Sequence, residues 1–458
     1  MEIKKFFYCL FAYILICCSG FTTSTARAGG KSFLQWAETP PMGWNSWDCY
    51  GPTVTEKEVR ANADYMATNL KKYGWEYIIV DIRWYVDNDK AHGYNQKNPV
   101  YNMDQYGRFM PSIKRFPSAA DGKGFRTLAD YMHSKGLKFG IHVMRGVPAE
   151  GIRRNLPVLG SRKMLRDICT PEGQCQWLRD MYSVLPGSEG SQEYYNSIFK
   201  LYAFWGVDYV KVDDLSSPYH LQEIDMIRKA IDNCGRKIVL STSPGPAPIA
   251  MAEHLKEHAN LWRICDDFWD DWQPLKKNFD YCNEWSAHIG SGHWPDADML
   301  PLGRIGIRAE RGDDRMSKFT RDEQYTLMTL CSIFRSPLMF GGDLPSNDGF
   351  TLSLLTNDEV LYVNQHSINN KQLYRNGDII VWTANDPKSK DTYLAVFNAS
   401  EQDNVKIPVS FDQLGLKKSC SVRDLWAKKD LGSYTNEFEP TLPKHGAGLY
   451  KIHGKKKK

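Results

Sequence analysis

The sequence lacks a surplus of charge of one sign. Its 58 basic and 54 acidic residues leave a formal net charge of +4 over 458 residues. This balance argues against the strongly basic surface of nucleic-acid-binding domains. We therefore expect no nucleic-acid partner, and the four lysines at 455–458 are most simply a solvated tail.

The sequence also lacks an apolar run that could span a membrane. The N-terminal apolar run covers only residues 6–18, shorter than the roughly 20 residues that a spanning helix needs. Two lysines precede it and the sequence ARA at 26–28 ends the polar stretch after it, which is typical of a signal peptide. We expect residues 1–28 to be removed and the protein to be periplasmic or secreted. The alternative is lipid anchoring at Cys17 or Cys18.

Cysteine is sparse, with 11 residues, of which three lie in the N-terminal segment. The other eight are too widely spaced for a small disulfide-dense scaffold. Cys169 and Cys175 are close enough to bridge a loop, and two free thiols fit equally well. No Cys-x-x-Cys or paired-histidine spacing accompanies them, so we expect no metal at these cysteines.

The length exceeds what one hydrophobic core usually supports, so we expect two or three domains, or one large barrel and a smaller domain. Between residues 33 and 360, strand-like and helix-like segments alternate, which indicates βα units and a parallel sheet. In one unit, Thr55 and Glu58 form a capping box, apolar residues then recur at steps of four and three, and Gly74 ends the helix. A mostly apolar run at 77–81 follows as a strand covered on both faces.

Eight segments of this kind predict an eight-stranded (β/α)8 TIM barrel, which carries its active residues at the C-terminal ends of the strands. Asp81, Asp213 and Asp267 stand at such ends. The predicted strands are 42–47, 77–81, 137–144, 209–213, 238–243, 261–267, 296–300 and 337–340.

From about Asn364 the pattern changes to short alternating strands without helices between them. We expect residues 361–458 to form an antiparallel β domain, a sandwich. Its predicted strands are 379–384, 392–398, 405–411, 421–426 and 448–452.

Two acidic clusters, at 213–214 and 266–267, each close a β-like run. Because side chains alternate along a strand, Lys211 would share a face with Asp213, and Arg263 with Asp267. Two carboxylates facing one another across a pocket are the minimal equipment for glycoside hydrolysis. The alternative is that these are ordinary strand-end or helix-cap aspartates.

Five segments, in order, resemble glycoside hydrolase family 27, the family of α-galactosidases and α-N-acetylgalactosaminidases. The resemblance runs from about Thr39 to the end and implies a catalytic βα barrel followed by an antiparallel β domain. The segments are TPPMGWNSW at 39–47, Asp81 before Trp84, KVDD at 211–214, Trp262-Arg263 leading to Asp267, and WPDADML at 294–300.

The resemblance implies Asp213 as the nucleophile and Asp267 as the general acid/base of a retaining mechanism that needs no cofactor or metal. Lys211 would help to keep Asp213 ionised, because a nearby cation favours the charged form. The sugar subsite implied by the resemblance consists of Trp47, Asp81, Lys211, Arg263 and Asp298.

The sequence departs from the family pattern at two places. Ile82 and Arg83 replace a second aspartate and a cysteine, and the segment STSPGP at 241–246 replaces the runs that set the preference for galactose or N-acetylgalactosamine. An apolar residue in place of the second carboxylate suits a sugar without a position-6 hydroxyl, such as β-L-arabinopyranose. We therefore add Ile82 and Ser243 to the candidate substrate-binding residues, although Arg83 or a residue near Ser243 could restore the missing contact.

The neighbouring aspartates and tryptophans have plainer expectations. Asp266 has the opposite parity to Asp267, so we expect it to point into the strand–helix packing. Asp214 and Asp270 receive the same interpretation. Trp44 should be a core residue, whereas Trp269 and Trp272 line outer subsites or pack against a loop.

The leading hypothesis is an exported retaining exo-glycosidase that acts on terminal α-D-galactosyl residues of oligo- or polysaccharides. A β-L-arabinopyranosidase on the same scaffold is the alternative, and a non-catalytic carbohydrate-binding protein is the rival from another class. A metal-dependent barrel enzyme is a further rival. The oxygen ligands of such a metal-dependent enzyme would be Asp213, Asp214, Asp266, Asp267, Asp296 and Asp298.

The sequence leaves the oligomeric state open.

Overall fold

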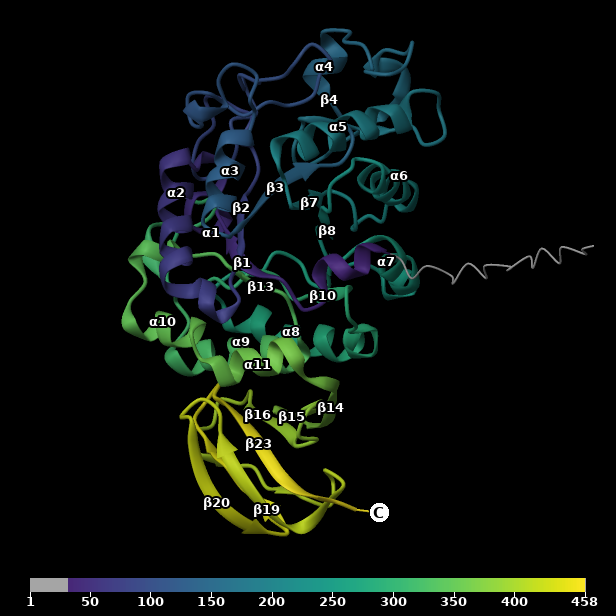
Figure 1. The fold of residues 1–458 in the computed structure, drawn as a ribbon. Coiled ribbons are helices and arrows are strands. Elements are labelled where there is room, and N and C mark those ends of the chain that lie inside the picture. Colours follow the sequence, from purple (N-terminus) through teal and green to yellow (C-terminus); the bar gives the residue numbers. More distant parts are fainter. Residues whose placement is uncertain (1–31, 458) are drawn as a thin grey trace, which may run out of the picture. The chain divides into compact units, whose positions relative to one another are not determined.

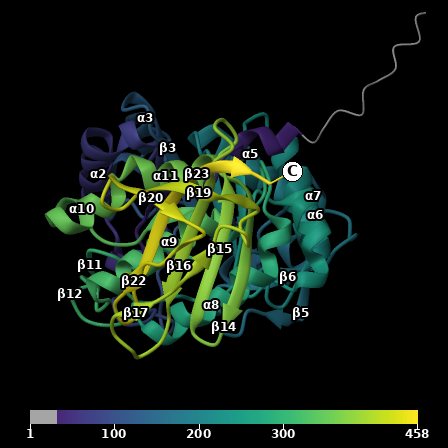
Figure 2. The same cartoon turned by 90° about the horizontal axis from the view of Figure 1, so that it is seen from below.

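A computed structural model describes residues 32–457. The expected signal peptide, residues 1–28, lies outside the described residues. Phe33–Lys458 is one compact unit, in which a curled parallel sheet surrounded by helices is followed by an antiparallel β domain (Figures 1 and 2).

Eight parallel strands form the first sheet, in the order β10-β9-β8-β7-β3-β2-β1-β13. β13 pairs with β1 through Met42 and Leu338. At the other end of the sheet, the Leu300 amide donates to the Met339 carbonyl at 2.7 Å, so the chain after β10 reaches β13. The predicted (β/α)8 barrel is confirmed. The strands are β1 (Met42–Asn45), β2 (Tyr77–Val80), β3 (Lys138–Met144), β7 (Tyr209–Asp213), β8 (Val239–Thr242), β9 (Leu261–Arg263), β10 (Trp294–Asp296) and β13 (Leu338–Phe340).

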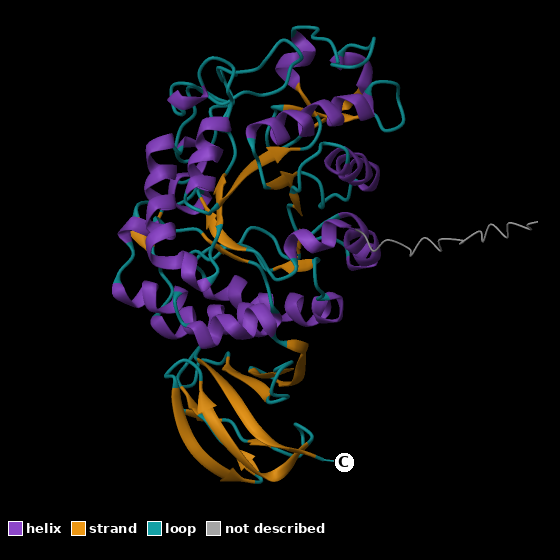
Figure 3. Ribbon diagram, viewed as in Figure 1, coloured by secondary structure: helices purple, strands orange, loops and turns teal. Residues whose placement is uncertain are grey.

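Helices cover the outside of this sheet (Figure 3). The predicted start of the first is confirmed, because the Thr55 amide donates to Glu58 at 2.9 Å in a capping box. Its predicted stop is confirmed too, because Gly74 takes the left-handed conformation with φ of 96°. The main helices of the barrel are α2 (Glu56–Tyr65), α3 (Arg126–Ser134), α5 (Ser191–Trp205), α6 (Leu221–Asp232), α7 (Ala252–His258), α8 (Trp272–Trp285) and α9 (Arg321–Phe334).

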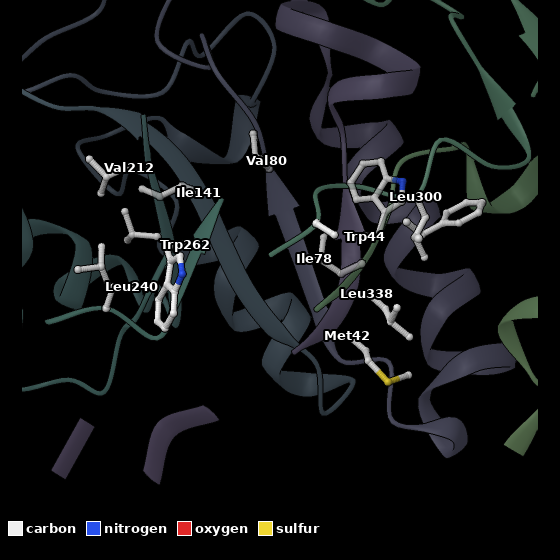
Figure 4. Close-up of a cluster of buried hydrophobic side chains, with 14 of the residues drawn as sticks. Met42, Trp44, Ile78, Val80, Ile141, Val212, Leu240, Trp262, Leu300 and Leu338 are labelled. Atoms are coloured by element: carbon white, nitrogen blue, oxygen red, sulfur yellow. The ribbon is translucent and has the colours of Figure 1, made fainter. Parts of the chain in front are cut away.

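Alternation along the strands separates two hydrophobic clusters. Trp44, Ile78 and Val212 pack with helix residues in one buried cluster, shown in Figure 4. Their strand neighbours, among them Tyr77 and Tyr209, belong to a second cluster inside the barrel. Polar side chains of the same inward parity therefore emerge at the C-terminal ends of the strands, above this second cluster.

Three of the predicted barrel strands differ from the structure by two residues or more at an end. The first stops at Asn45, whose Oδ1 accepts a bond from the Trp47 amide at 2.8 Å as the chain turns into α1 (Trp47–Tyr50). β9 stops at Arg263, shortly after its pairing with β8 ends at Trp262. The predicted strand at 296–300 instead occupies Trp294–Asp296.

A small sheet is inserted after β3. Its order is β4-β6-β5, and the loop between β5 and β6 contains Trp177. Cys169 and Cys175, for which the sequence left a bridge or two thiols open, are both free thiols. The elements of this insertion are β4 (Val147–Pro148), α4 (Ala149–Arg153), β5 (Cys169–Gln174) and β6 (Met181–Val184).

The second domain is built on a six-stranded antiparallel sheet in the order β14-β15-β16-β23-β19-β20. Two short strand pairs pack over one face around Val409, Phe438 and Ile452. They are β17 (Val405–Lys406) with β22 (Thr441–Leu442), and β18 (Val409–Ser410) with β21 (Glu437–Phe438). The predicted antiparallel β domain is confirmed. Helix α11 runs from Asp358 to His366, so the expected start of this domain at 361 falls inside a helix. The sheet strands are β14 (Ile368–Asn376), β15 (Ile379–Asn385), β16 (Thr392–Asn398), β19 (Leu416–Asp424), β20 (Lys429–Thr435) and β23 (Ala447–Lys456).

No helix among residues 32–457 is both long and apolar enough to cross a bilayer.

Candidate functional site

A cavity of about 510 Å³ opens at the C-terminal ends of the barrel strands. Its size falls in the range of small-molecule sites. All the predicted site residues except Ser243 line it: Trp47, Asp81, Ile82, Lys211, Asp213, Arg263, Asp267 and Asp298.

Asp213, the last residue of β7, is held by two hydrogen bonds. His142 Nε2 lies 3.0 Å from its Oδ2, and the Asp214 amide donates to its Oδ1 at 2.9 Å. Burial raises the pKa of Asp213, but the hydrogen bond and charge of His142, the Lys211 ammonium and the amide together bring the pKa well below its usual range. Asp213 is therefore an ionised carboxylate in the ligand-free cavity.

Asp81 and Lys211 form an ion pair beside Asp213. Lys211 Nζ lies 3.3 Å from Asp81 Oδ2, which also accepts a bond from Asn45 Nδ2 at 2.7 Å. Burial raises the pKa of Asp81, but the charges of His142 and Lys211 and the hydrogen bond from Asn45 outweigh the effect of burial. The pKa of Asp81 therefore lies below its usual value. The two aspartates raise the pKa of Lys211 above its usual value despite burial. The cavity floor thus holds a fixed set of charges that can bind ring hydroxyls.

Arg263 joins the other two predicted aspartates. Its Nη1 lies 2.8 Å from Asp298 Oδ1, and its Nη2 donates to Asp267 Oδ1 at 3.2 Å. Burial and the charge of Asp267 raise the pKa of Asp298. The Asp267 side chain is 47 % exposed, so it stands at the open side of the cavity.

The shared strand face predicted for Arg263 and Asp267 is wrong, although the two side chains do meet. β9 ends at Arg263, and a loop brings Asp267 back to it. Asp266 is exposed and accepts the Asp267 amide at 2.8 Å, so its predicted place in the strand–helix packing is also wrong.

Asp214 and Asp270 pack away from the cavity, as predicted. Arg145 Nη2 lies 2.9 Å from Asp214, and Arg315 Nη2 lies 2.6 Å from Asp270. Both carboxylates stabilise loops around the site through their arginine partners.

Aromatic rings form one wall. Trp47 stacks on Tyr94 with 6.0 Å between the ring centroids, and the ring centroids of Tyr94 and Trp177 are 6.2 Å apart. Trp269 lines the cavity as well, whereas Trp272 stacks on His445 of the β domain at 3.7 Å. Such rings offer flat apolar surface to a sugar face.

Trp44 is a fully buried core residue, as predicted, and its Nε1 donates to the Gly342 carbonyl at 2.8 Å.

Ile82 lies in the cavity wall next to Asp81 and is 2 % exposed. Arg83 points elsewhere, because its guanidinium pairs with Asp180 at 2.7 Å and with Asp89 at 3.0 Å. Arg83 therefore does not replace the acceptor that Ile82 lacks.

Ser243 does not line the cavity. It is 1 % exposed, its amide donates to the Val212 carbonyl at 2.9 Å, and its own carbonyl accepts the Leu215 amide at 2.9 Å. It therefore ties β8 to β7 through its backbone, and Pro244 is the residue of this segment that reaches the cavity.

The sequence analysis missed His142, Tyr94 and Trp177. His142 had a usable signal, because it shares the inward parity of β3 and pairs in register with Lys211. Tyr94 and Trp177 lie in long loops, where no strand or helix period marks their direction.

Four aspartates of the cavity lie beside basic side chains: Asp81, Asp213, Asp267 and Asp298. Among the described residues, the only group of three or more histidine, cysteine, aspartate or glutamate side chains with ligand atoms within 4.8 Å of one another is Asp225, His254 and His258. None of these three lines the cavity. The metal-dependent rival therefore has no support at the predicted positions.

The chain contains the two domains of an α-galactosidase. A family model described as Alpha galactosidase A matches residues 39–151 and 180–366, and one described as the Alpha galactosidase C-terminal beta sandwich domain matches 376–452. The chain is thus an α-galactosidase-type glycoside hydrolase. It belongs to glycoside hydrolase family 27, as the motifs predicted, and the non-catalytic rival is wrong.

Relatives agree over nearly the whole chain. The α-galactosidase of Coffea arabica is 30 % identical, covering 90 % of this chain and 93 % of its own. The crystal structure of a GH27 β-L-arabinopyranosidase from Geobacillus stearothermophilus is 53 % identical with a TM-score of 0.90, covering 92 % of this chain and 97 % of its own. An α-galactosidase I from Mortierella vinacea, 22 % identical over 92 % of this chain and 98 % of its own, shares the fold with a TM-score of 0.69.

Proposed function

We propose that this protein is a retaining exo-β-L-arabinopyranosidase and that α-D-galactosides are its poorer substrates. The observation that carries the proposal is Ile82 in the cavity wall beside Asp81. The sequence favours the α-galactosidase and gives the arabinopyranosidase as the alternative, whereas the place of Ile82 in the cavity wall supports the opposite order.

The proposed preference for the pentoside depends on the exocyclic group of the sugar. β-L-arabinopyranose has the ring configuration of α-D-galactose without the exocyclic carbon and its hydroxyl. A galactoside bound beside Ile82 would bury that hydroxyl without an acceptor, which costs roughly 1–3 kcal/mol, or about 10–100-fold in discrimination. Arg83, bound to Asp180 and Asp89, does not offset this loss.

Sequence identity supports the same order. The β-L-arabinopyranosidase of Geobacillus stearothermophilus is 53 % identical, whereas the α-galactosidases of Coffea arabica and Cellvibrio japonicus are 30 % and 26 % identical.

In the proposed mechanism, Asp213 attacks the anomeric carbon and forms a covalent glycosyl ester as the glycosidic bond breaks. Asp267 gives its proton to the leaving oxygen, and then takes one from the water that hydrolyses the ester. His142 and Lys211 favour the ionised nucleophile. Asp267 meets bulk water at the open side of the cavity, where leaving group and water exchange.

Two aryl glycosides test the specificity. We expect kcat/KM for 4-nitrophenyl β-L-arabinopyranoside to exceed that for the α-D-galactopyranoside by at least about 10-fold. Ile82→Asp should shift the ratio toward the galactoside by about 10–100-fold. Ile82→Val is the matched control, because it adds space without an acceptor and should shift the ratio far less. Strong galactosidase activity in the parent that Ile82→Asp leaves unchanged would refute the pentose preference.

Alanine substitutions of Asp213 and Asp267 should lower turnover in different ways. Asp213→Ala should abolish turnover of every substrate, because no glycosyl ester can form. Asp267→Ala should spare activated aryl glycosides far more than natural ones, since an activated leaving group needs little protonation. Asp280→Ala, at an exposed aspartate of α8 outside the cavity, is the matched control and should retain activity. Equal losses on both substrate types in Asp267→Ala, or an inverted first product by NMR, would contradict these roles.

We also propose that residues 1–28 direct export and are removed. The test is the mass of the mature protein expressed in a bacterium with its leader intact, and the expected N-terminus is Gly29. A mature protein that begins at a diacylglycerol-modified Cys17 or Cys18 would indicate lipid anchoring in place of cleavage after Ala28. A cytoplasmic chain that retains Met1 would refute both soluble export and lipid anchoring.

A further inference from the structure

Two histidines and an aspartate meet on the outer face of the barrel, where α6 lies beside α7 (Figure 1). His254 and His258 are four residues apart on α7, so their rings stack, with centroids 4.1 Å apart. Asp225 of α6 points at both, and its Oδ1 lies 2.8 Å from His254 Nε2 and 3.2 Å from His258 Nε2. Three ligand atoms thus converge from two separate helices.

The second nitrogen of each ring is already held. His258 Nδ1 donates to the backbone carbonyl of His254 at 2.8 Å, which leaves the His258 Nε2 lone pair facing Asp225. His254 Nδ1 lies 2.6 Å from the Tyr219 hydroxyl and can donate to its oxygen, which frees Nε2 in the same way. An imidazole that donates its far N–H to a carbonyl or hydroxyl is the usual arrangement around a metal-bound histidine.

We propose that Asp225, His254 and His258 bind a transition-metal ion of the Zn²⁺ class, with water as the fourth ligand. Zn–N and Zn–O bonds of about 2.0–2.1 Å place tetrahedral ligand atoms about 3.3 Å apart. The separations of Asp225 Oδ1 from the two Nε2 atoms, 2.8 and 3.2 Å, need to open by about half an ångström or less to reach this value. The His254 and His258 side chains are 17 % and 23 % exposed, so water and the ion have access.

The donor set decides the class of ion. Two imidazole nitrogens and one carboxylate oxygen suit Zn²⁺, Co²⁺, Ni²⁺ or Cu²⁺, whereas Ca²⁺ and Mg²⁺ prefer oxygen ligands only. The ion would cross-link α6 to α7 and, through His254, fix Tyr219 in the loop that follows the catalytic strand β7. None of the three ligands lines the cavity, so the role is structural and does not depend on the sugar specificity proposed above.

The test uses the full chain without a polyhistidine tag, treated with EDTA and dialysed. We expect isothermal titration with ZnSO₄ to give one site per chain, metal analysis to find one Zn²⁺ after desalting, and the Tm to rise by at least about 2 °C. Co²⁺ should give the visible absorption of a tetrahedral nitrogen–oxygen site. Mg²⁺ and Ca²⁺ should have no effect.

His258→Ala, at the last residue of α7, and Asp225→Asn should each lose the bound Zn²⁺ and the Tm rise while keeping the kcat of the metal-free parent. His288→Ala is the matched control, because His288 lies 3.8 Å from Glu253 of α7 but belongs to no group of three possible metal ligands among the described residues. A parent that binds no Zn²⁺ at micromolar concentration, or variants that bind as the parent does, would overturn the proposal.

Discussion

The buried aspartates of this cavity have pKa values shifted in opposite directions because their neighbours differ. Asp213 and Asp81 face Lys211 and His142, so each has a pKa below its usual value although both are buried. Burial and the carboxylate of Asp267 raise the pKa of Asp298 despite Arg263. Neighbouring carboxyl groups with pKa values shifted apart are typical of sites that carry out acid–base chemistry.

His142 is expected to act as a positioning residue for Asp213. Removing its ring in His142→Ala takes away the largest effect that lowers the pKa of Asp213. That pKa should then rise, so the acidic limb of the kcat/KM profile moves to higher pH, and kcat at the optimum falls by about 10–100-fold. His142→Gln, which keeps a donor, should recover part of the loss.

The control for this prediction is His133→Ala. His133 makes a similar contact outside the cavity, where its Nε2 lies 2.7 Å from Asp208 Oδ2. Its loss should leave the acidic limb in place. An unmoved acidic limb in His142→Ala would contradict the positioning role.

Asp296 should make stability depend on pH. Burial and the charge of Asp298 raise its pKa to about 7 in the folded protein, against 3.8 for the ordinary group. The unfolded chain therefore releases its proton first, and the contribution of Asp296 to stability is complete below pH 3.8 and is lost as pH rises to about 7.

Asp296→Asn removes this titration and keeps an oxygen that can accept the Asp298 amide, now 2.9 Å from Asp296 Oδ1. We expect the difference in Tm between pH 5 and pH 8 to shrink by a few degrees in the variant. Asp130→Asn, on an exposed helix face, should leave that difference unchanged. A parent-like difference in Asp296→Asn would show that the side chain is ionised at both pH values.

At the scale of elements, strands buried on both faces were predictable and edge strands were not. β14 and β20, which the sequence analysis missed, are the two edges of the six-stranded sheet. Their sequences, INNKQLYRN and KDLGSYT, are mostly polar and largely exposed. Charged and polar edge strands prevent pairing between molecules, and the same polarity removes the alternation by which a strand is recognised.

The capping box of α2 provides a test at this scale. Thr55→Ala should lower the free energy of unfolding by about 1 kcal/mol, because it removes the hydroxyl that donates to Glu58 Oε2 at 2.8 Å and so helps to hold the carboxylate that accepts the Thr55 amide. Turnover should be unchanged. Thr68→Ala, an exposed position further along whose hydroxyl bonds only to the Asp64 carbonyl, should have little effect. Urea unfolding of both variants would measure the difference, and equal stabilities would argue against the cap.

At the scale of the whole molecule, the barrel and the β domain share α9. This helix is buried along most of its length and contacts both β16 and β23. His445, just before β23, stacks on Trp272 and lies 2.7 Å from Glu323, while its carbonyl accepts the Thr326 hydroxyl at 2.6 Å. The β domain therefore supports the barrel from which the catalytic side chains project.

We expect the described chain to unfold in a single transition, and His445→Ala to lower its Tm. The variant leaves Glu323 without its imidazole partner, which costs roughly 1–3 kcal/mol, and removes the ring that stacks on Trp272. kcat/KM should stay within about 2-fold, since the cavity is not touched. Calorimetry would measure both effects.

The control lies in the same part of the β domain. His453→Ala removes a 76 % exposed side chain of β23 and should leave the Tm unchanged. Two separate transitions in the parent would contradict a shared core.

The sequence by itself determined where the barrel strands lie along the chain, the start and stop of the first barrel helix, the two-domain plan and the candidates at the ends of β2 and β7. These features are local, because a strand's period of two and a cap's spacing of three are set within a few residues. Only the tertiary structure decided that Arg83 pairs with Asp180, that the backbone of Ser243 links β8 to β7, and that His142 lies within hydrogen-bond distance of Asp213. Such contacts join residues tens of positions apart in the sequence, up to 97 for Arg83 and Asp180. Their partners are fixed by the register of the sheet and the packing around it.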